Sequence, residues 1–390
     1  MTAAPTERGR ALLDWVEARR DGLVDFLVEL AAMESPSDDP DSQAAPQAML
    51  REAFDELGYR VRHLPGRRTG GHLWMVPRER ERGRPGQLLL GHSDTVWPVG
   101  TLARMPLEVD DGVVRGPGTF DMKGGLTQMV FALRALRDLD LEPPATPVAF
   151  INTDEEIGSP ESQRWVAAVA RRVCRAFVLE PARGPRGLIK TARKGVANYT
   201  LTVNGKAAHA GLDPTGGASA IEALARLVPS IHAMADLDRG RSVNVGVVRG
   251  GTRPNVIAAE AVAELDVRVA TTVDFEDVDR ALRALSTDVP GTSLTLDGGL
   301  RAPPLERTPR NRRLWDAARD AGRAVGLDLE ETMVGGGSDG NTASRYTATL
   351  DGLGAVGDGA HALDEHLRVD PLIQRTALLA ELLLLPVEGA

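Results

Sequence analysis

The stretch from Gln87 to Val96 reads QLLLGHSDTV, an apolar run that ends in a glycine, a histidine and a carboxylate. A short apolar run of this kind is typical of a strand buried on both faces, as in the parallel sheets of α/β proteins. Residues two apart at a strand end point the same way, so Asp94 can hydrogen-bond one ring nitrogen of His92 and leave the other for a metal. An isolated pair is more often an ordinary buried histidine with a satisfying aspartate, so its meaning depends on the rest of the chain.

Strand-like and helix-like segments alternate around this stretch. Strands are predicted at 59–63, 72–76, 147–152 and 176–180, and helices at 124–139, 162–170 and 313–325. This alternation predicts a largely parallel sheet covered by helices on both faces. The apolar segment LLAELLLLP near the C-terminus is expected to be a buried terminal helix.

The pattern changes between residues 193 and 301. Strand-like alternation occurs at 197–203, 242–249 and 257–269, and helical spacing at 216–232 and 275–285. A β-α-β-β-α-β unit of about this length is a ferredoxin-like module. The predicted fold is therefore one discontinuous α/β domain, residues 1–192 and 302–390, interrupted by a smaller α+β domain at 193–301.

Length and composition narrow the class of protein. At 390 residues the chain exceeds the roughly 250–300 residues that one core usually serves. Its 42% hydrophobic and 26% charged residues indicate a globular protein, and its net charge of −9 argues against general nucleic-acid binding. The single cysteine, Cys174, excludes an internal disulfide and a cysteine-based zinc site, so a metal would have to be held by His, Asp and Glu.

The sequence shows no membrane or export signal. Near the N-terminus, charges recur at helical spacing where a signal peptide would have an apolar region. No window reaches the roughly 18–20 apolar residues of a membrane span. A cytoplasmic protein without membrane or nucleic-acid partners is therefore expected.

Three more carboxylates lie in turns where they can do chemistry. Asp121 lies in the glycine-rich turn GPGTFDMKGG, where the commoner role of an aspartate is to cap a helix. Glu155 and Glu156 follow a predicted strand, and a solvated acidic turn is the ordinary explanation. Because adjacent side chains point in different directions, one glutamate can bind a metal while the other acts as a general base.

A fourth carboxylate and a second histidine complete the candidate site. Glu180 is placed at the end of an apolar strand, where a carboxylate is costly unless it is paired or metal-bound. His361 lies in the turn GDGAH, just before the last predicted helix, and is preferred to the nearby His366. Open α/β sheets bind ligands at the carboxyl ends of their strands, where these side chains are expected to meet.

Six short motifs, in order, resemble those of the M20 metallopeptidase family, of the glutamate carboxypeptidase, acetylornithine deacetylase and succinyl-diaminopimelate desuccinylase type. They are GHSDTV, GTFDMKGG, TDEEIGS, VLEP, GKAAHAG and GAH. The resemblance covers nearly the whole chain and implies a zinc-peptidase-like sheet with an inserted lid. It also implies a homodimer that forms through this lid.

The resemblance implies a site with two Zn²⁺ ions, for which Co²⁺ can substitute. His92, Asp121 and Glu180 would hold one ion, and Asp121, Glu156 and His361 the other, with Asp121 bridging. Two zinc ions against three carboxylates and one hydroxide give a neutral cluster, which suits the dry end of a sheet.

Further roles follow from the same resemblance. Glu155 would be the general base for a water that bridges the zinc ions, and Asp94 would orient His92. The family also has a cis peptide after the bridging aspartate, which is expected here between Asp121 and Met122.

Substrate-binding residues are implied in both predicted domains. His209 would stabilise the oxyanion in the other subunit of a dimer, while Asn255 and Arg268 would bind a substrate carboxylate. Without the family, these three residues would be taken as an exposed loop histidine, an Asx turn and a sheet residue. The glycine-rich loop with Gly336 and Ser338 lacks the Lys-Ser/Thr of a phosphate loop, so nucleotide binding is not expected. The resemblance implies that this loop lines the substrate pocket.

The leading hypothesis is a dizinc hydrolase that cleaves an amide bond next to a free carboxylate, as a glutamate-carboxypeptidase-like enzyme does. An N-acyl-amino-acid deacylase is the alternative, so the substrate would be an N-acyl amino acid or dipeptide-like molecule. A non-hydrolytic metal-binding protein on the same fold is a remote third. A nicotinamide-dependent enzyme would need G-x-G-x-x-G after an early strand, and no such segment occurs there.

Overall fold

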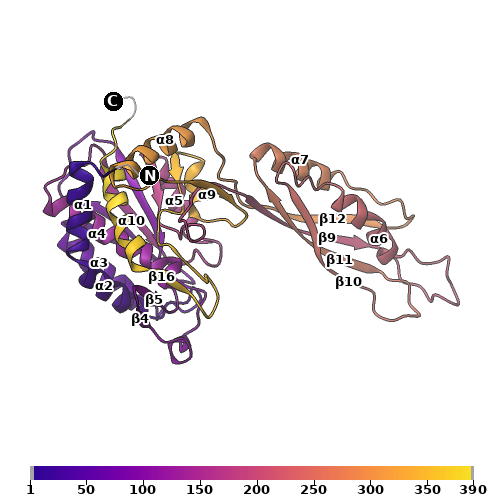
Figure 1. The fold of residues 1–390 in the computed structure, drawn as a ribbon. Helices are drawn as coiled ribbons and strands as arrows, with labels where there is room; N and C mark the ends of the chain where they lie inside the picture. Colours follow the sequence, from indigo (N-terminus) through magenta and orange to yellow (C-terminus); the bar gives the residue numbers. More distant parts are fainter. Residues whose placement is uncertain (1–3, 388–390) are drawn as a thin grey trace. The chain divides into compact units, whose positions relative to one another are not determined.

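The chain folds as two compact units in the computed structural model, which describes residues 4–387 (Figure 1). The larger unit contains the chain up to Thr191, Arg307–Met333 and the chain from Ser338 onward, and the smaller unit contains Ala192–Glu306 and Val334–Gly337. The predicted boundaries at 192/193 and 301/302 lie close to these divisions. The sequence did not indicate that 334–337 belongs with the smaller unit.

Backbone and side-chain hydrogen bonds explain the placement of residues 334–337. The Lys194 N–H donates to the Val334 carbonyl at 3.0 Å. The Arg193 guanidinium donates to the Gly336 and Gly337 carbonyls at 3.2 and 2.9 Å. These bonds attach the glycine-rich loop to the strand that enters the smaller unit.

The larger unit is built on a six-stranded sheet with the order β1-β2-β6-β3-β7-β14. β3, β6, β7 and β14 are mutually parallel, and β2 is antiparallel to its neighbours. The strands are β1 (Tyr59–Leu64), β2 (His72–Pro77), β3 (Gly86–His92), β6 (Thr146–Asn152), β7 (Val173–Val178) and β14 (Ala348–Leu350). The mostly parallel sheet predicted from the sequence is confirmed.

The central strands are apolar without alternation because both of their faces are covered. In β3, Leu89 belongs to the main core of the larger unit, whereas Leu88 and Leu90 belong to a second apolar cluster. All three leucines are fully buried. The predicted strand at 176–180 differs from β7, which ends at Val178, so Glu180 lies two residues beyond the strand and not at its end.

Helices cover both faces of this sheet. The main core includes side chains of α1, α2, α3, α4, α8 and α10, and the second cluster includes side chains of α5 and α9. Their bounds are α1 (Glu7–Glu17), α2 (Arg20–Ala32), α3 (Ala44–Glu56), α4 (Gly124–Asp138), α5 (Gln163–Ala170), α8 (Pro309–Ala324), α9 (Asp339–Ser344) and α10 (Val369–Leu383). The C-terminal apolar segment forms the buried α10 that was predicted, and Figure 1 shows this helix beside α1.

Small elements lie around the main sheet. A second sheet has the order β15-β16-β5-β4, and β13 pairs with β8. Their bounds are η1 (Thr101–Ala103), β4 (Glu108–Asp110), β5 (Val113–Arg115), η2 (Thr119–Lys123), β8 (Ile189–Arg193), β13 (Glu331–Val334), β15 (Gly357–Asp358) and β16 (His366–Arg368). Among residues 4–387, no helix combines the length and apolar character needed to cross a membrane.

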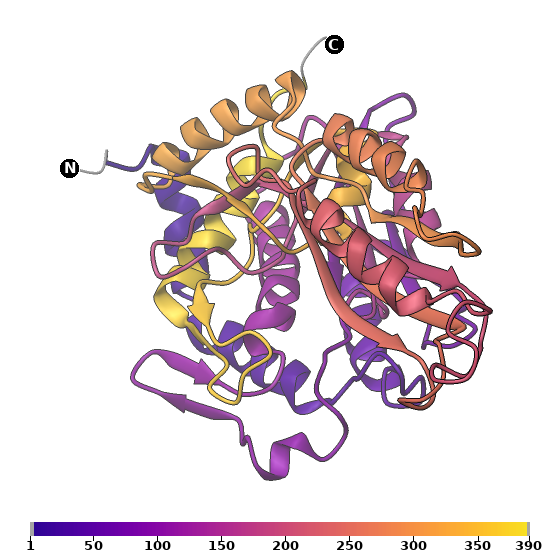
Figure 2. The ribbon, with the colours of Figure 1, turned by 90° about the vertical axis from the view of Figure 1, so that its right-hand side faces the viewer.

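The smaller unit has the predicted β-α-β-β-α-β order. Its elements are β9 (Gly195–Asn204), α6 (Ala220–His232), β10 (Ser242–Gly250), β11 (Glu260–Val269), α7 (Thr272–Arg283) and β12 (Ser293–Ala302). The four strands form one antiparallel sheet, β10-β11-β9-β12, and α6 and α7 lie against it (Figure 2). Side chains of both helices share a single core with the buried face of this sheet. α6 begins at Ala220, not at 216, because the Ser219 hydroxyl caps it by accepting from the Glu222 N–H.

Candidate metal centre

The parallel strands bring three polar segments to one edge of the sheet. β3 ends at His92, β6 ends at Asn152 just before the acidic turn, and Glu180 follows β7. β3 pairs with β6 on one side and with β7 on the other, so the carboxyl ends of these strands are neighbours. His92, Glu155, Glu156 and Glu180 therefore gather at this edge, as the sequence predicted.

Asp121 reaches the same place from a glycine-rich turn. Gly118 has φ = 71°, a left-handed conformation that favours glycine, and it precedes the turn η2, in which Asp121 lies. The Lys123 N–H closes this turn on the Gly118 carbonyl at 2.9 Å. The peptide between Asp121 and Met122 is cis, as the family resemblance implied.

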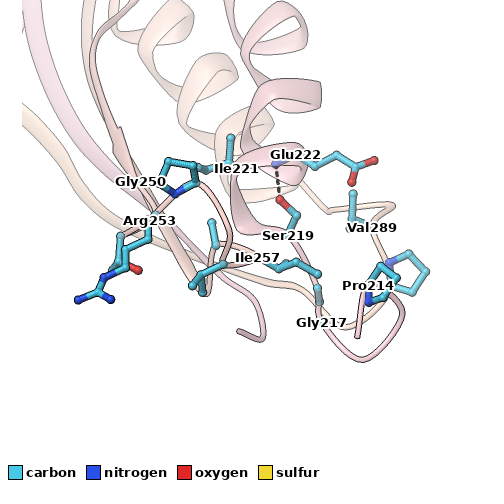
Figure 3. Close-up of a pocket in the computed structure, with 16 residues that line it drawn as sticks. Pro214, Gly217, Ser219, Ile221, Glu222, Gly250, Arg253, Ile257 and Val289 are labelled. Carbon is cyan, nitrogen blue, oxygen red and sulfur yellow. Dashed lines mark hydrogen bonds between the residues drawn. The ribbon is translucent and has the colours of Figure 1, made fainter. Parts of the chain in front are cut away.

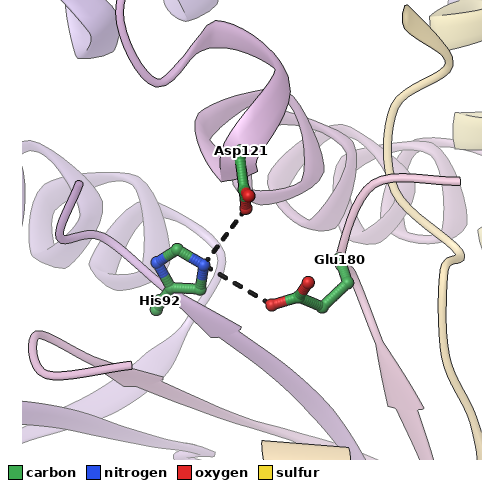
Figure 4. Close-up of side chains that lie close together, drawn as sticks. All are labelled: His92, Asp121 and Glu180. Atoms are coloured by element: carbon green, nitrogen blue, oxygen red, sulfur yellow. Dashed lines mark ion pairs between the residues drawn. The ribbon is translucent and has the colours of Figure 1, made fainter. Parts of the chain in front are cut away.

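The first group of candidate ligands is His92, Asp121 and Glu180 (Figure 4). The His92 Nε2 lies 3.4 Å from Asp121 Oδ1 and 3.5 Å from Glu180 Oε1. His92 and Glu180 are buried. One nitrogen and two carboxylate oxygens thus converge on a point that water barely reaches.

The second group shares Asp121 and adds Glu156 and His361. The His361 Nε2 lies 3.5 Å from Asp121 Oδ2 and 3.0 Å from Glu156 Oε2. The two groups use different oxygens of Asp121, which is the geometry of a bridging carboxylate. His361 is more accessible than His92: its side chain is 52% exposed against 1%.

Asp94 lies behind His92, on the far side of its ring. The His92 Nδ1 is 3.4 Å from Asp94 Oδ1 and 3.0 Å from the Asp94 carbonyl oxygen. Asp94 Oδ2 accepts hydrogen bonds from the Ser37 hydroxyl at 2.6 Å and the Glu156 N–H at 3.2 Å. Asp94 therefore orients His92 and also fixes the backbone of Glu156, which belongs to the second group.

Several of the candidate ligand atoms have no hydrogen-bond partner within the described part of the protein, which suits a metal-binding role. Among the described residues, His92 Nε2, Asp121 Oδ1 and Glu156 Oε1 are buried side-chain atoms without a hydrogen-bond partner. Buried polar atoms are usually satisfied, and exceptions need an explanation. In each group the ligand atoms lie within 4.8 Å of one another, a spacing that a cation can bridge. Imidazole nitrogens and carboxylate oxygens are a donor set that zinc accepts.

The pKa shifts show how strongly this cluster attracts positive charge. Burial opposes a charge on His92, but the nearby carboxylates of Asp121, Asp94 and Glu180 outweigh this effect and raise the pKa of His92 well above its usual range. Hydrogen bonding to Asp121 and Glu156 raises the pKa of His361 to about 10. The field that holds protons on these histidines would equally hold a divalent cation in their place.

Glu155 belongs to neither group, but the charges of Glu180, His92 and Glu156 act on its carboxyl. Burial raises the pKa of its carboxyl well above the usual range, and the negative charge of Glu180 adds to the effect. A carboxylate with a raised pKa is a stronger base, which suits proton transfer near neutral pH. The predicted division between Glu156 as a ligand and Glu155 as a base is compatible with this arrangement.

Two buried acids that the sequence did not single out support the site. Asp339 accepts from Asn152 Nδ2 at 2.5 Å and from the Ser159 hydroxyl at 2.6 Å. Glu365 accepts from three backbone N–H groups of the Asp121 turn. In the sequence, only the acidic character of Asp339 and Glu365 pointed to such a role. No local pattern could mark it, because the partners named above lie 180–247 residues away along the chain.

The other histidines of the larger unit stay outside the two groups. His72 is buried, and the His63 Nε2–H donates to the Gly70 carbonyl oxygen at 2.7 Å. His366 lies in β16, where its Nδ1 is 2.8 Å from the Asp364 carbonyl oxygen. The preference for His361 over His366 thus agrees with the geometry.

In the smaller unit, His209 and Asn255 lie on two bonded loops. The His209 Nδ1 accepts from the Gly211 and Leu212 N–H groups at 3.1 and 3.2 Å, which leaves Nε2 as the donor of the neutral ring. The Ala210 N–H donates to the Asn255 carbonyl at 3.0 Å. His209 is exposed.

A cavity of about 820 Å³ adjoins the Asn255 loop (Figure 3). Its walls are the start of α6, the end of β10 and the segment at 252–258. The labelled charged side chains, Glu222 and Arg253, extend from opposite sides of this region in Figure 3. None of the candidate zinc ligands lines this cavity.

Three predicted substrate residues have other partners in this structure. Arg268 binds the Asp266 carboxylate at 2.9 and 3.0 Å, and the Gly336 carbonyl accepts from Arg193. The Ser338 hydroxyl caps α9 and donates to Asp351 Oδ2 at 2.5 Å. A substrate would have to share or displace these contacts.

The fold and the site together define a metal-dependent hydrolase. Its two groups of histidine and carboxylate ligands share Asp121 and lie near Glu155, whose raised pKa suits a general base. Comparison with known proteins gives the family. Residues 88–385 match the model of peptidase family M20/M25/M40, and the chain belongs to this family. The family resemblance and the prediction of a metal-dependent amide hydrolase are confirmed.

Named relatives and solved structures agree with this assignment. Carboxypeptidase G2 of Pseudomonas sp. (strain RS-16) is 26% identical over 98% of this chain and 94% of its own length. The succinyl-diaminopimelate desuccinylase of Thioalkalivibrio sulfidiphilus is 27% identical over 84% of this chain and 89% of its own. Aminopeptidase PepT from Bacillus cereus has the same fold, with a TM-score of 0.78 at 21% identity over 93% of this chain and 98% of its own.

Proposed function

We propose that this protein is a dizinc hydrolase that cleaves an amide bond next to a free carboxylate, in the manner of a carboxypeptidase. The observation that carries the proposal is the pair of ligand groups that share Asp121 through different oxygens. Glu155 lies at the same edge of the sheet with a raised pKa. The similarity to carboxypeptidase G2 over 98% of the chain favours this type of substrate.

The five ligands would hold two zinc ions, one in each group. What zinc supplies when bound is Lewis acidity, which polarises a carbonyl oxygen and acidifies water. Asp94 keeps the His92 ring oriented so that Nε2 points at Asp121 and Glu180. Its second oxygen holds the Glu156 backbone, so a single carboxylate stabilises one ligand in each group.

Glu155 would act first as the general base and then as the general acid of the reaction. It takes a proton from the attacking water and later delivers it to the nitrogen of the departing amine. The neighbouring negative charges of Glu180 and Glu156 favour its protonated form after the first transfer. The two transfers return Glu155 to its starting state, so no other acid is needed.

An N-acyl-amino-acid deacylase is the second candidate. It uses the same bond cleavage and releases a free amino acid, and the similarity to succinyl-diaminopimelate desuccinylases favours it. The two candidates differ in the acyl group, so the substrate remains an N-acyl amino acid or a dipeptide-like molecule.

Substrate recognition is proposed for residues of the smaller unit and of the glycine-rich loop. Arg268 and Asn255 would bind the substrate carboxylate, and His209 would donate from Nε2 to the developing oxyanion of the partner subunit's reaction. Gly336 and Ser338 would line the pocket. A homodimer through the smaller unit and a cytoplasmic location complete the proposal.

Replacement of Glu155 by Gln tests the central role. The variant should keep both zinc ions but lose activity by about 10²–10⁴-fold, because the base is gone while the ligands remain. Zinc content by atomic absorption and kcat on a panel of N-acyl amino acids and dipeptides provide the readout. Wild-type turnover in the variant would refute the assigned base.

A further inference from the structure

We infer that Glu365 is a positioning residue that sets the geometry of the shared ligand Asp121. This inference rests on the proposed function, in which Asp121 bridges two zinc ions. Glu365 lies four residues after His361, so one short segment would supply both a ligand and the support of another ligand. Its side chain is 1% exposed.

Both carboxylate oxygens of Glu365 are filled by donors. Oε1 accepts from the Phe120 and Asp121 N–H groups, each at 3.0 Å. Oε2 accepts from the Gly118 N–H at 3.0 Å and from the Trp97 indole Nε1–H at 2.8 Å. Three of these four donors belong to the backbone of the turn that presents Asp121.

The backbone of Glu365 holds the same turn. Its carbonyl accepts from the Gly116 N–H at 3.1 Å, directly beyond the pairing of Arg115 with His366. The β5–β16 ladder therefore continues into the Asp121 turn through Glu365. The turn is fixed along its length from residue 116 to residue 121.

A carboxylate is needed because all four partners are donors. A glutamine would keep one acceptor oxygen but would direct an amide NH₂ toward the Gly118 N–H and the Trp97 indole N–H. Buried donors without an acceptor are costly, so the turn would shift to find other partners. The buried Lys123 ammonium lies in the field of Glu365 and provides positive charge near the buried carboxylate.

A shifted turn would move Asp121 relative to both ligand groups at once. Replacement of a residue that orients a metal ligand typically lowers the metal affinity 10–100-fold. Glu365 acts through the backbone of Asp121, the one ligand that both groups share. Glu365→Gln should therefore weaken the binding of both zinc ions, whereas loss of an ordinary ligand would weaken chiefly one.

The test measures zinc affinity of the full-length protein by competition with a chromophoric chelator. Glu365→Gln should bind both zinc ions about 10–100-fold more weakly. At saturating zinc, kcat should fall while KM stays near the wild-type value, because no substrate contact is removed. A variant with lower thermal stability but unchanged zinc affinity would show a merely structural role and overturn the inference.

Glu161→Gln is the matched control. Glu161 also binds a loop with both oxygens, accepting from the Arg67 and Arg68 N–H groups at 2.9 and 3.0 Å. That loop carries no candidate ligand, so zinc affinity should not change. An equal loss in Glu161→Gln would mean that general destabilisation lowers zinc affinity, which would overturn the role of Glu365.

Two further variants keep the test decisive. If Glu365→Gln does not fold, Trp97→Phe can be tested, because it removes one donor to Glu365 and leaves the three backbone bonds. We expect a several-fold loss of zinc affinity in this variant. An unchanged zinc affinity would overturn the inference. His361→Ala should lose one zinc ion. If His361→Ala keeps both zinc ions, the proposed metal assignment fails. If His361→Ala loses one zinc ion but Glu365→Gln keeps the wild-type zinc affinity, only the positioning role is rejected.

Discussion

At the scale of single residues, the acids around the site divide into ligands and supports. Asp339 is a support: it is buried, and its two partners, Asn152 and Ser159, flank the turn that carries Glu155 and Glu156. Burial raises the pKa of Asp339 to about 7. Its charge is therefore a cost to the folded state at neutral pH.

The stability of the Asp339→Asn variant should reveal this cost. Between the ordinary pKa of 3.8 and about 7, folded Asp339 keeps a proton that the unfolded chain has released, so its contribution to wild-type stability falls as pH rises through this window. The asparagine does not titrate, and the Ser159 hydroxyl can rotate to accept from its amide. The variant should thus gain on the order of 2–4 kcal/mol relative to wild type between pH 4 and pH 8.

Urea unfolding of the metal-free proteins at pH 4 and pH 8 measures this difference. A stability gap between the two proteins that does not change with pH would contradict the raised pKa of Asp339.

The candidate ligands and Asp94 behind His92 were predictable from the sequence, but the supports Glu365 and Asp339 were not. His92, Asp121, Glu156, Glu180 and His361 lie in short motifs with recognisable neighbours, and the structure brings all five together. Glu365 and Asp339 act on backbone N–H groups, an amide and a hydroxyl from remote segments. Any residue can offer a backbone N–H, so no sequence pattern marks such partners.

At the scale of elements, periodicity predicted which segments form helices and strands, while local contacts decide where they end. β7 ends at Val178, and the next residue, Leu179, passes close to the start of α4. A Cβ on Gly125 in α4 would lie 2.1 Å from the Leu179 carbonyl oxygen. This close approach of helix and backbone places Glu180 beside the turn of Asp121, and sequence periodicity cannot show it.

Replacement of Gly125 by Ala should separate these elements. Overpacking of a tight contact costs about 1–3 kcal/mol, and the displacement of Glu180 should also weaken zinc binding. Urea unfolding and chelator competition measure both effects.

Gly22→Ala in α2 is the control for the same substitution in a helix. Nothing lies within 4 Å of the added methyl, so the change should stabilise the protein by up to about 1 kcal/mol. Equal stability of the two variants would show that the contact at Gly125 relaxes without cost.

At the scale of the whole molecule, the two units have separate buried cores. The core of the smaller unit includes side chains from its own four-stranded sheet and from α6 and α7. All five candidate ligands belong to the larger unit. The insertion between about 193 and 301 was predictable because the change from buried to alternating strands is visible in the sequence.

Zinc should therefore stabilise one unit selectively. In differential scanning calorimetry, zinc at 1,000 times its Kd should raise the unfolding free energy of the larger unit by about 4 kcal/mol. A transition that belongs to the smaller unit should stay where it is in the metal-free protein. Two transitions that move together would show that the units unfold cooperatively.

The discontinuity of the larger unit has a consequence for the order in which a newly made chain can fold. The smaller unit is almost contiguous, so most of it, Ala192–Glu306, leaves the ribosome in one piece. The larger unit needs β14 and the buried α10, which are synthesised after most of the smaller unit. The usual sequence of N-terminal folding before C-terminal folding is thus reversed. While the smaller unit folds, the apolar strands of the first half of the chain are still exposed to solvent. This half of the nascent chain is therefore the part most in need of a chaperone.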